Sequence, residues 1–297
     1  KRRLAYVFSA ICILITIFSV VTRGMNLGID FTGGTLVEVG YQSAAELQQV
    51  RQKLADSGFS DAMAQHFGTS SDVLVRLAPR KGVSSADLSN KAFAAIKDVA
   101  EGAELRRVEF VGPQVGDELT EDGGLAMLYA LIGILIYVTL RFEYRFSLGS
   151  VIALIHDVLI TVGVFSLFQI EFDLTVLAAI LAVIGYSLND TIVVYDRIRE
   201  NFRRLRKGSP EQIINVSLNQ TLSRTTITSF TTLLVLIALF LFGGDIIHGF
   251  AIALIVGIVI GTYSSIYVAS AAALALGVSK ADLMTVQKEG VDIDGRP

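Results

Sequence analysis

The chain has 297 residues, of which 52% are hydrophobic and only 18% charged, and its mean hydropathy is +0.58. A soluble globular protein carries about 25% charged residues, so the composition favours a membrane protein and excludes a disordered chain. A single cysteine, Cys12, excludes a disulfide scaffold, and three scattered histidines do not indicate a zinc cluster. We therefore expect no metal and no cofactor, and the net charge of −3 gives no sign of nucleic-acid binding.

Six apolar stretches are long enough to cross a bilayer, for which a helix needs about 20 mostly apolar residues. They are residues 4–22, 123–140, 146–170, 174–195, 225–244 and 246–279. The first stretch follows three basic residues, but it is longer than the apolar core of a signal peptide, which has about 7–15 residues. We therefore expect it to be retained as a membrane helix. The chain does not begin with Met, so we also expect some residues to precede it.

Lysine and arginine are distributed unevenly between the two sides of these spans, and this bias sets the orientation of a membrane protein. Basic residues lie before the first span, between the second and third, in segment 196–224 and after the last span, whereas the opposite short loops contain none. We therefore expect both termini in the cytoplasm. The expected order is a first helix at 4–22, an external domain at 24–122, a five-helix bundle at 123–279 with a basic cytoplasmic loop at 196–224, and a cytoplasmic tail at 280–297.

The external segment is acidic, with 9 basic and 15 acidic residues between 24 and 122. Its pattern predicts strands at 35–41, 62–67, 73–77 and 105–111, with helices at 43–57 and from Ser84 or Ser85 to 102. Ser43 and Glu46 have the spacing of a capping box at the start of the first of these helices. The order β-α-β-β-α-β predicts a ferredoxin-like fold. No combination of residues in this segment indicates catalysis, so we expect a binding or docking module.

Two motifs rich in small residues flank this domain, at 30–35 and 111–116. Asp30, Gly33 and Gly34 belong to the first motif, and Gly112 and Pro113 belong to the second. We interpret both as tight turns where the domain leaves the membrane.

Ionisable residues within a membrane span are expensive, so each one is a candidate functional residue. Asp157 lies near the middle of the third predicted span, beside His156. Asp190, in the fourth, and Arg224, at the start of the fifth, lie at comparable depth and could pair across the two helices. Such a pair could couple proton entry to helix movement. An aspartate that alternates between pairing with an arginine and binding a proton would link the arrival of the proton to the position of the other helix. It could equally be a buried ion pair that only locks the bundle.

The last span carries small residues at every fourth position, among them Gly257, Gly261 and Ser265. In lipid, such a stripe lets two helices approach closely. The basic segment 197–207 is amphipathic, and its attraction to anionic membrane lipids is sufficient to explain it.

Several motifs resemble those of SecF-type proteins in the SecD–SecF family of protein-export membrane proteins, which belongs to the RND superfamily. They are DFTGGT (30–35), VEFVGPQVG (108–116), ALIHDV (153–158), IGYSLNDTIVVYDRIREN (184–201), TLSRT (221–225) and SSIYVAS (264–270). They occur in order over nearly the whole chain.

This resemblance implies half of an RND-type bundle of six transmembrane helices, with a SecD protein supplying the other half. It implies residence in the bacterial inner membrane and use of the proton-motive force to promote late export of preproteins through SecYEG. Asp190 and Arg224 match the family residues implicated in proton coupling, and Asp157 lies in a family motif of less certain role. SecD, SecYEG, the translocating preprotein, YajC and YidC are the partners that it implies.

Three other functions are compatible with parts of the sequence. An RND-like exporter of small molecules or lipids would need a second six-helix half and usually has a larger external domain. An aspartyl protease could use Asp157 and Asp190 as a dyad, but the chain has no Gly-x-Gly-Asp motif, and we expect no enzyme. A scaffold for a partner protein is the third alternative.

Overall fold

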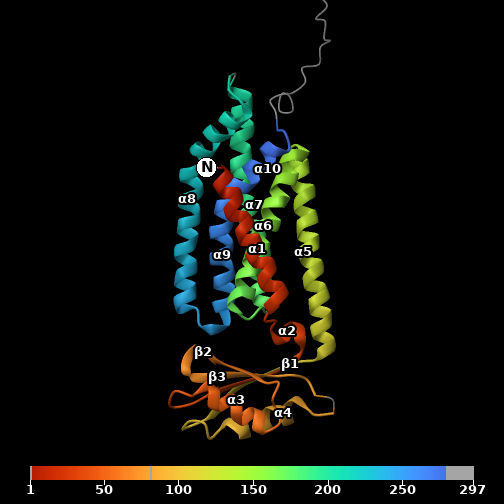
Figure 1. Ribbon diagram of the computed structural model, residues 1–297, viewed down its shortest axis with the longest axis vertical. Coiled ribbons are helices and arrows are strands. Elements are labelled where there is room, and N and C mark those ends of the chain that lie inside the picture. The colour runs from red at the N-terminus through yellow and green to blue at the C-terminus, as the bar shows by residue number, and fades with distance from the viewer. Residues whose placement is uncertain (1, 81, 206, 279–297) are drawn as a thin grey trace, which may run out of the picture.

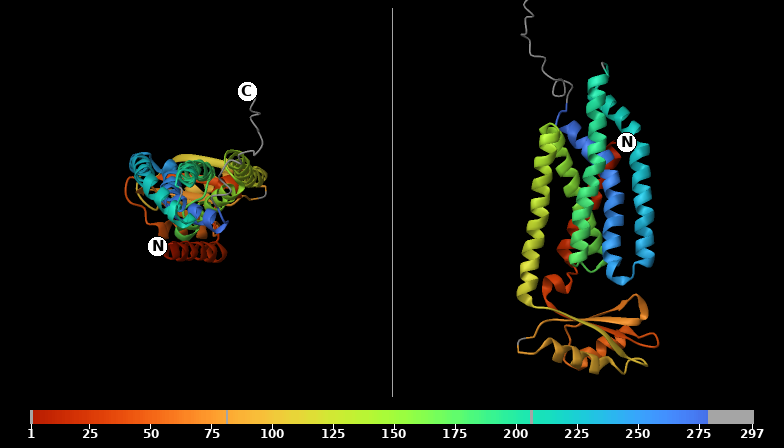
Figure 2. Two further views of the ribbon diagram at one scale, coloured as in Figure 1. Left: turned by 90° about the horizontal axis from the view of Figure 1, so that it is seen from above. Right: turned by 180° about the vertical axis from the view of Figure 1, so that it is seen from behind.

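The computed structural model describes residues 2–80, 82–205 and 207–278, so the tail expected at 280–297 lies outside the described residues. Long helices run side by side, and a small domain with a sheet lies beyond one end of them (Figure 1). The view from behind has the same two-part arrangement, with the N-terminus at the end of the bundle far from the sheet (Figure 2).

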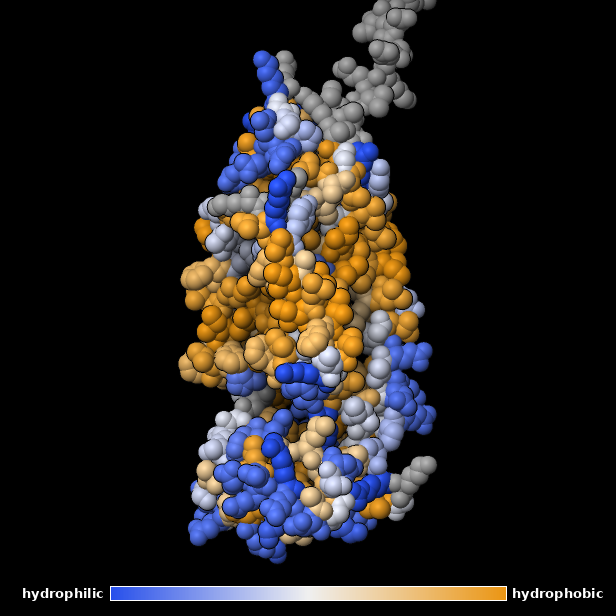
Figure 3. Space-filling model, in the orientation of Figure 1, coloured by the Kyte–Doolittle hydropathy of each residue, from blue (hydrophilic) through white to orange (hydrophobic). Residues whose placement is uncertain are grey.

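Six of the described helices are long and apolar enough to cross a membrane. They are α1 (Arg2–Arg23), α5 (Pro113–Arg141), α6 (Tyr144–Phe168), α7 (Leu174–Arg204), α8 (Pro210–Phe242) and a last one that begins as α9 (His248–Ser264). A hydrophobic band crosses this bundle between two hydrophilic ends (Figure 3). The chain is therefore a multi-pass membrane protein.

Helix α7 contributes more buried residues than any other helix of the bundle and packs against α6, α8 and α9. Val176, Ala179 and Ile180 on α7 are completely inaccessible to solvent. By contrast, α5 and α8 have large apolar side chains on their outer faces, such as Leu140 at 84% and Phe242 at 86% exposure. Those outer faces are available to lipid or to another protein chain.

The external domain is a four-stranded antiparallel sheet with the strand order β2-β3-β1-β4. Its strands are β1 (Gly34–Gly40), β2 (Met63–Phe67), β3 (Thr69–Leu77) and β4 (Glu104–Val111). Helices α3 (Leu47–Asp56) and α4 (Ser85–Ile96) cover the face of the sheet that points away from the bundle (Figure 1). The order β1-α3-β2-β3-α4-β4 is the order that the alternating sequence pattern predicts.

The start of the first helix in this domain differs from the prediction. Helix α3 begins at Leu47 rather than at residue 43, and its N-cap is Glu46 with no side-chain hydrogen bond, so Ser43 and Glu46 do not form a capping box. The reason is that the N–H of Ala45 donates to the carbonyl of Ser70 at 3.0 Å, which holds this segment in extended form beside β3. Ser84 caps α4 as predicted, with its hydroxyl accepting from the N–H of Asp87 at 3.1 Å.

Two boundaries of the helical bundle also differ from the prediction. Residues 196–224 are not a loop, because α7 continues to Arg204 and α8 already begins at Pro210. Ser209 and Gln212 form a capping box that starts α8 at this point. Similarly, α5 begins at Pro113, ten residues before the apolar stretch that predicted it. Helices with polar ends therefore extend beyond the hydrophobic band on both sides.

Candidate functional site

The two glycine motifs that flank the external domain pack directly against each other. A Cβ atom on Gly33, whose φ is +66°, would lie 2.8 Å from Cα of Pro113, and a Cβ atom on Gly116 would lie 2.8 Å from the backbone nitrogen of Gly33. Gly34 has a φ of +139°, and a Cβ atom there would lie 2.7 Å from the carbonyl oxygen of Leu77. Gly112 is the N-cap of α5, which begins at Pro113. Only glycine permits this backbone-to-backbone contact, which brings the two chain connections to the membrane together.

We expected Asp30 to lie in a turn, but it lies in the short helix α2 (Ile29–Thr32). Its carboxylate accepts a hydrogen bond at 3.0 Å from the N–H of Leu174, the first residue of α7. Free N–H groups at a helix start favour such an anionic partner. Asp30 therefore connects the segment before β1 to the end of α7 that faces the sheet.

A second set of contacts attaches the sheet to the same end of the bundle. Arg76 on β3 donates to the carbonyl of Leu27 and, at 2.7 Å, to Oδ1 of Asn26. Nearby, Gln65 donates to the carboxylate of Glu171 in the loop between α6 and α7, at 3.4 Å. Burial raises the pKa of Glu171, and although Arg76 and Gln65 oppose this effect, Asp173 and Asp30 add to it. Gln65, Glu171, Asp173 and Asp30 border a cleft of about 510 Å³ between the sheet and the bundle.

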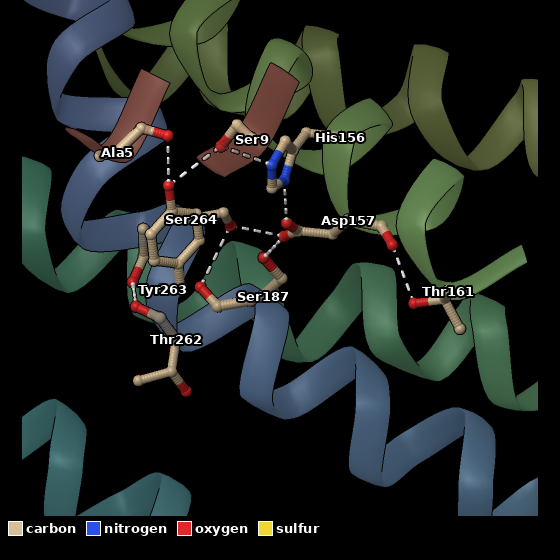
Figure 4. A network of polar contacts seen from close by, with 11 residues as sticks. Ala5, Ser9, His156, Asp157, Thr161, Ser187, Thr262, Tyr263 and Ser264 are labelled. Atoms are coloured by element: carbon tan, nitrogen blue, oxygen red, sulfur yellow. Dashed lines mark hydrogen bonds and ion pairs between the residues drawn. The ribbon is translucent and has the colours of Figure 1, made fainter. Parts of the chain in front are cut away.

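Within the bundle, Asp157 is completely buried and receives hydrogen bonds from three directions (Figure 4). Ser187 of α7 donates to its Oδ2 atom at 2.5 Å, and the hydroxyl of Ser264 of α9 lies 2.7 Å from the same atom and 3.1 Å from the carbonyl oxygen of Gly261. Its Oδ1 atom lies 2.9 Å from Nδ1 of His156, which is 4% exposed. Asp157 therefore connects three membrane helices.

The network continues from His156 to the first helix of the chain (Figure 4). Nε2 of His156 lies 3.0 Å from the hydroxyl of Ser9 on α1, and that hydroxyl lies 3.0 Å from the hydroxyl of Tyr263 on α9. Tyr263 in turn donates to the carbonyl of Ala5 at 2.8 Å. Sequence reasoning did not identify Ser9 or Tyr263, because a serine in an apolar stretch and a tyrosine in a span are common in helices that bind nothing.

Asp190 forms a second buried polar site on α7, with 3% of its surface exposed. Ser229 of α8 donates to its Oδ2 atom at 3.4 Å, and the hydroxyl of Thr262 of α9 lies 2.7 Å from the hydroxyl of Ser229 and 2.7 Å from the carbonyl oxygen of Ile258. Thr191 and Thr225 are also buried, and in the part of the chain that the structure describes their hydroxyl oxygens have no hydrogen-bond partner. The site is thus lined by hydroxyl groups from three helices.

Arg224 is not part of this buried site. Within the described residues no ion pair joins it to Asp190, and its side chain is exposed on α8. It borders a cavity of about 280 Å³ together with Asp196, Arg197 and Glu200. The two residues that the sequence places at comparable depth are therefore neighbours without direct contact in this structure.

Helix α9 lies very close to α7, contacts Asp157 directly and reaches Asp190 through Ser229 of α8. Gly257 faces Val183, whose side chain a Cβ atom would overlap, and a Cβ atom on Gly261 would lie 3.1 Å from Cβ of Ser187. This close approach brings Ser264 to Asp157 and Thr262 to Ser229. The glycines thus position the hydroxyl groups that both polar sites use.

The last predicted span is not one regular α-helix. After α9 the chain forms a wide turn of π-helix, η2 (Ser265–Ala269), before α10 (Ser270–Ala275). Wider turns leave carbonyl groups without their usual α-helical partners. Here Ser265 donates to the carbonyl of Thr262, Ser270 donates to that of Ile266, and the buried hydroxyl of Tyr195 on α7 donates to that of Ala269 at 2.9 Å.

The contact between Tyr195 and the wide turn also depends on a glycine of α6. A Cβ atom on Gly149 would lie 2.5 Å from the hydroxyl oxygen of Tyr195 and 3.4 Å from the carbonyl oxygen of Ala269. Sequence reasoning did not predict this junction, since hydropathy alone does not distinguish a π turn from an α turn.

Comparison with known proteins identifies relatives over the full chain. Residues 91–279 match the family described as protein export membrane protein SecD/SecF, C-terminal, and residues 18–45 match the SecD/SecF GG motif. The protein translocase subunit SecF of Vibrio alginolyticus is 58% identical over 99% of this chain and 95% of its own length. Its counterpart from Pseudomonas aeruginosa is 49% identical over 100% of this chain and 96% of its own length.

Two solved structures are also similar. The crystal structure of SecDF, a translocon-associated membrane protein from Thermus thermophilus, is 39% identical and matches with a TM-score of 0.82 over 92% of this chain. A SecDF structure in a super-membrane-facing form is 40% identical and matches with a TM-score of 0.65 over 91% of this chain. This chain spans only 37% of the first SecDF chain and 38% of the second. The full-length relatives, the two family matches and the shared fold together place this chain in the SecD/SecF family of protein-export membrane proteins, among its SecF subunits.

Proposed function

We propose that this chain works as the SecF-type subunit of a protein-export complex in the bacterial inner membrane. Together with a SecD-type protein, it uses the proton-motive force to promote late steps in the translocation of preproteins through SecYEG. YajC and YidC are further proposed partners. The chain takes part in transport and not in catalysis, with both termini in the cytoplasm and the sheet domain in the periplasm.

The observation that carries this proposal is the buried carboxyl group of Asp190 within a membrane-spanning helix. Ionisable groups at such positions mark ion or proton pathways by default. Asp190 is surrounded by hydroxyl groups of α8 and α9 rather than by a fixed counter-ion. Such surroundings allow a carboxyl group to gain and lose a proton without breaking a buried ion pair.

The exposed face of α8 supports the proposed SecD-type partner. Arg224 lies on that face, close to the cytoplasmic end of the bundle, and a cation facing lipid would be unfavourable. We propose that the partner half of an RND-type bundle covers this face. The much greater length of the SecDF chain from Thermus thermophilus, of which this chain spans 37%, is consistent with such a second half.

The external domain supports a docking role in the same machine. We propose a ferredoxin-like fold for it, which its β-α-β-β-α-β order and its strand order β2-β3-β1-β4 support. We propose that it contacts the emerging preprotein together with the periplasmic part of the SecD-type partner.

The substitution Asp190→Asn tests the proposal, because it keeps the shape of the side chain and removes the titratable group. In membrane vesicles that also contain the SecD-type partner, we expect it to abolish the proton-dependent stimulation of preprotein export while copurification of the two subunits is unchanged. Asp196→Asn is the matched control, since Asp196 lies on the same helix but is 45% exposed and paired with Arg141 at 3.2 Å. Full stimulation with Asp190→Asn would disprove proton coupling through this residue.

A further inference from the structure

The hydrogen bonds that lead from Asp157 to α1 have directions that can be assigned by counting hydrogens. Tyr263 donates its only hydroxyl hydrogen to the carbonyl of Ala5 at 2.8 Å, since a carbonyl can only accept. In its 3.0 Å contact with Ser9, Tyr263 must therefore accept. Ser9 is the donor in that contact, so its hydroxyl has no hydrogen left to donate to another group.

This direction determines the state of His156. Because the hydrogen of Ser9 points to Tyr263, the 3.0 Å contact between Ser9 and Nε2 of His156 is a hydrogen bond only if Nε2 carries a proton. The network therefore requires that Nε2 be the donor.

The other ring nitrogen completes the assignment. Nδ1 of His156 lies 2.9 Å from Oδ1 of Asp157, and two arrangements satisfy this contact. Either an imidazolium donates to a carboxylate, or a protonated carboxyl group donates to a neutral imidazole. Both arrangements have the same number of protons and a net charge of zero. Ser187 donates to the other oxygen, Oδ2, which therefore acts as an acceptor, so one proton is shared between Oδ1 and Nδ1.

We propose that His156 and Asp157 form a proton-binding site separate from Asp190, and that its occupancy controls how α9 is attached to α1. When one proton leaves Nε2 to water, that nitrogen becomes an acceptor and the remaining proton stays between Nδ1 and the carboxylate. Ser9 then rotates to donate to His156, and Tyr263 rotates to donate to Ser9. Each hydroxyl keeps its own hydrogen, but the carbonyl of Ala5 loses its donor. Loss of the proton thereby breaks the hydrogen bond between Tyr263 on α9 and the carbonyl of Ala5 on α1.

The surroundings of the pair leave few other groups that could change its charge. Serines face it from α1, α7 and α9, and Tyr263 is the titratable group that joins its network from a neighbouring helix. Among the described residues, no charged side chain of α1, α7 or α9 is hydrogen-bonded to the pair. The assignment of hydrogens depends on geometry alone, whereas the use of this proton in export rests on the proposed function.

Nitrogen-15 NMR of the histidine side chains tests this proposal. The chain has three histidines, so this subunit can be labelled at histidine and assembled in lipid with its unlabelled SecD-type partner. His156→Gln assigns the signals of His156. We expect its Nε2 to be protonated, and we expect Tyr263→Phe to move that signal toward the unprotonated position, because Ser9 is then free to donate to the ring.

Two further variants make the result unambiguous. Ser9→Ala interrupts the chain of hydrogen bonds without changing Tyr263, and should also change the Nε2 signal. Tyr186→Phe is the control, because the hydroxyl of Tyr186 contacts Thr232 outside this network. Unchanged signals of His66 and His248 report that each variant is folded.

An unprotonated Nε2 in the unmodified protein, or an Nε2 signal that neither Tyr263→Phe nor Ser9→Ala changes, would overturn the proposal. Neither result depends on export. If instead Asp190→Asn exports normally while the NMR result is as expected, the proposed function fails and the proton-binding pair stands.

Discussion

Replacing Asp157 by alanine or by asparagine should have very different effects on stability. Alanine removes both oxygens, so two buried groups lose their partner: the hydroxyl of Ser187 and Nδ1 of His156. Ser264 keeps its 3.1 Å hydrogen bond to the carbonyl of Gly261. Each polar group left buried without a partner costs about 1–3 kcal/mol, so the two together should lower the free energy of unfolding by about 2–6 kcal/mol.

Asparagine should be tolerated, because it can reproduce the same contacts. Its carbonyl oxygen takes the place of Oδ2 and accepts from the two serines, while its amide group donates to Nδ1 of His156. This arrangement requires His156 to carry its proton on Nε2, which is the state inferred from the hydrogen-bond directions. We therefore expect Asp157→Asn to cost about 1 kcal/mol or less.

Thermal unfolding of the purified protein, followed by circular dichroism, measures the difference. About 2 °C per kcal/mol is expected for a chain of this size. Asp157→Ala should then lower Tm by about 4–12 °C, and Asp157→Asn by about 2 °C or less. Equal losses of Tm for the two variants would refute the assignment of hydrogens, because an asparagine that cannot satisfy His156 would leave a group unpaired as alanine does.

Two more predictions concern residues outside this network. Glu171→Gln should raise Tm at neutral pH but not at a pH below the ordinary pKa of glutamate. Burial raises the pKa of Glu171, so the ionised side chain destabilises the folded protein. Melting curves at several pH values measure this difference. Tyr195→Phe should lower Tm by about 2–4 °C, because it leaves the buried carbonyl of Ala269 without its 2.9 Å hydrogen bond; melting curves against Tyr186→Phe measure this.

Each of these two predictions has a clear contrary outcome. For Glu171, the sign follows from the raised pKa: the contribution of the side chain to stability is fully present at low pH and is lost as pH rises through the folded-state value. A gain from Glu171→Gln that is the same at acidic and neutral pH would contradict this reasoning. For Tyr195, a loss no larger than that of Tyr186→Phe would mean that its hydroxyl does not support the wide turn.

The sequence by itself determined the number of membrane spans and the order of the secondary-structure elements. Six apolar stretches, one-sided basic residues and the alternating pattern between 24 and 122 are local properties, and each is encoded within a window of about 20 residues. They sufficed for the number of spans and for the order of elements in the sheet domain. They also singled out Asp157 and Asp190, because a charge in an apolar stretch is visible without a structure.

Only the tertiary structure decided which groups these carboxylates contact. Ser9 and Tyr263 lie at opposite ends of the chain, and no local pattern connects them. The expected partner of Asp190, Arg224, lies at a suitable depth but on a different face of α8, so Ser229 contacts Asp190 instead. Depth in a membrane follows from sequence position, whereas the rotation of a helix about its axis is set by packing, and the close approach at Gly257 and Gly261 determines it here.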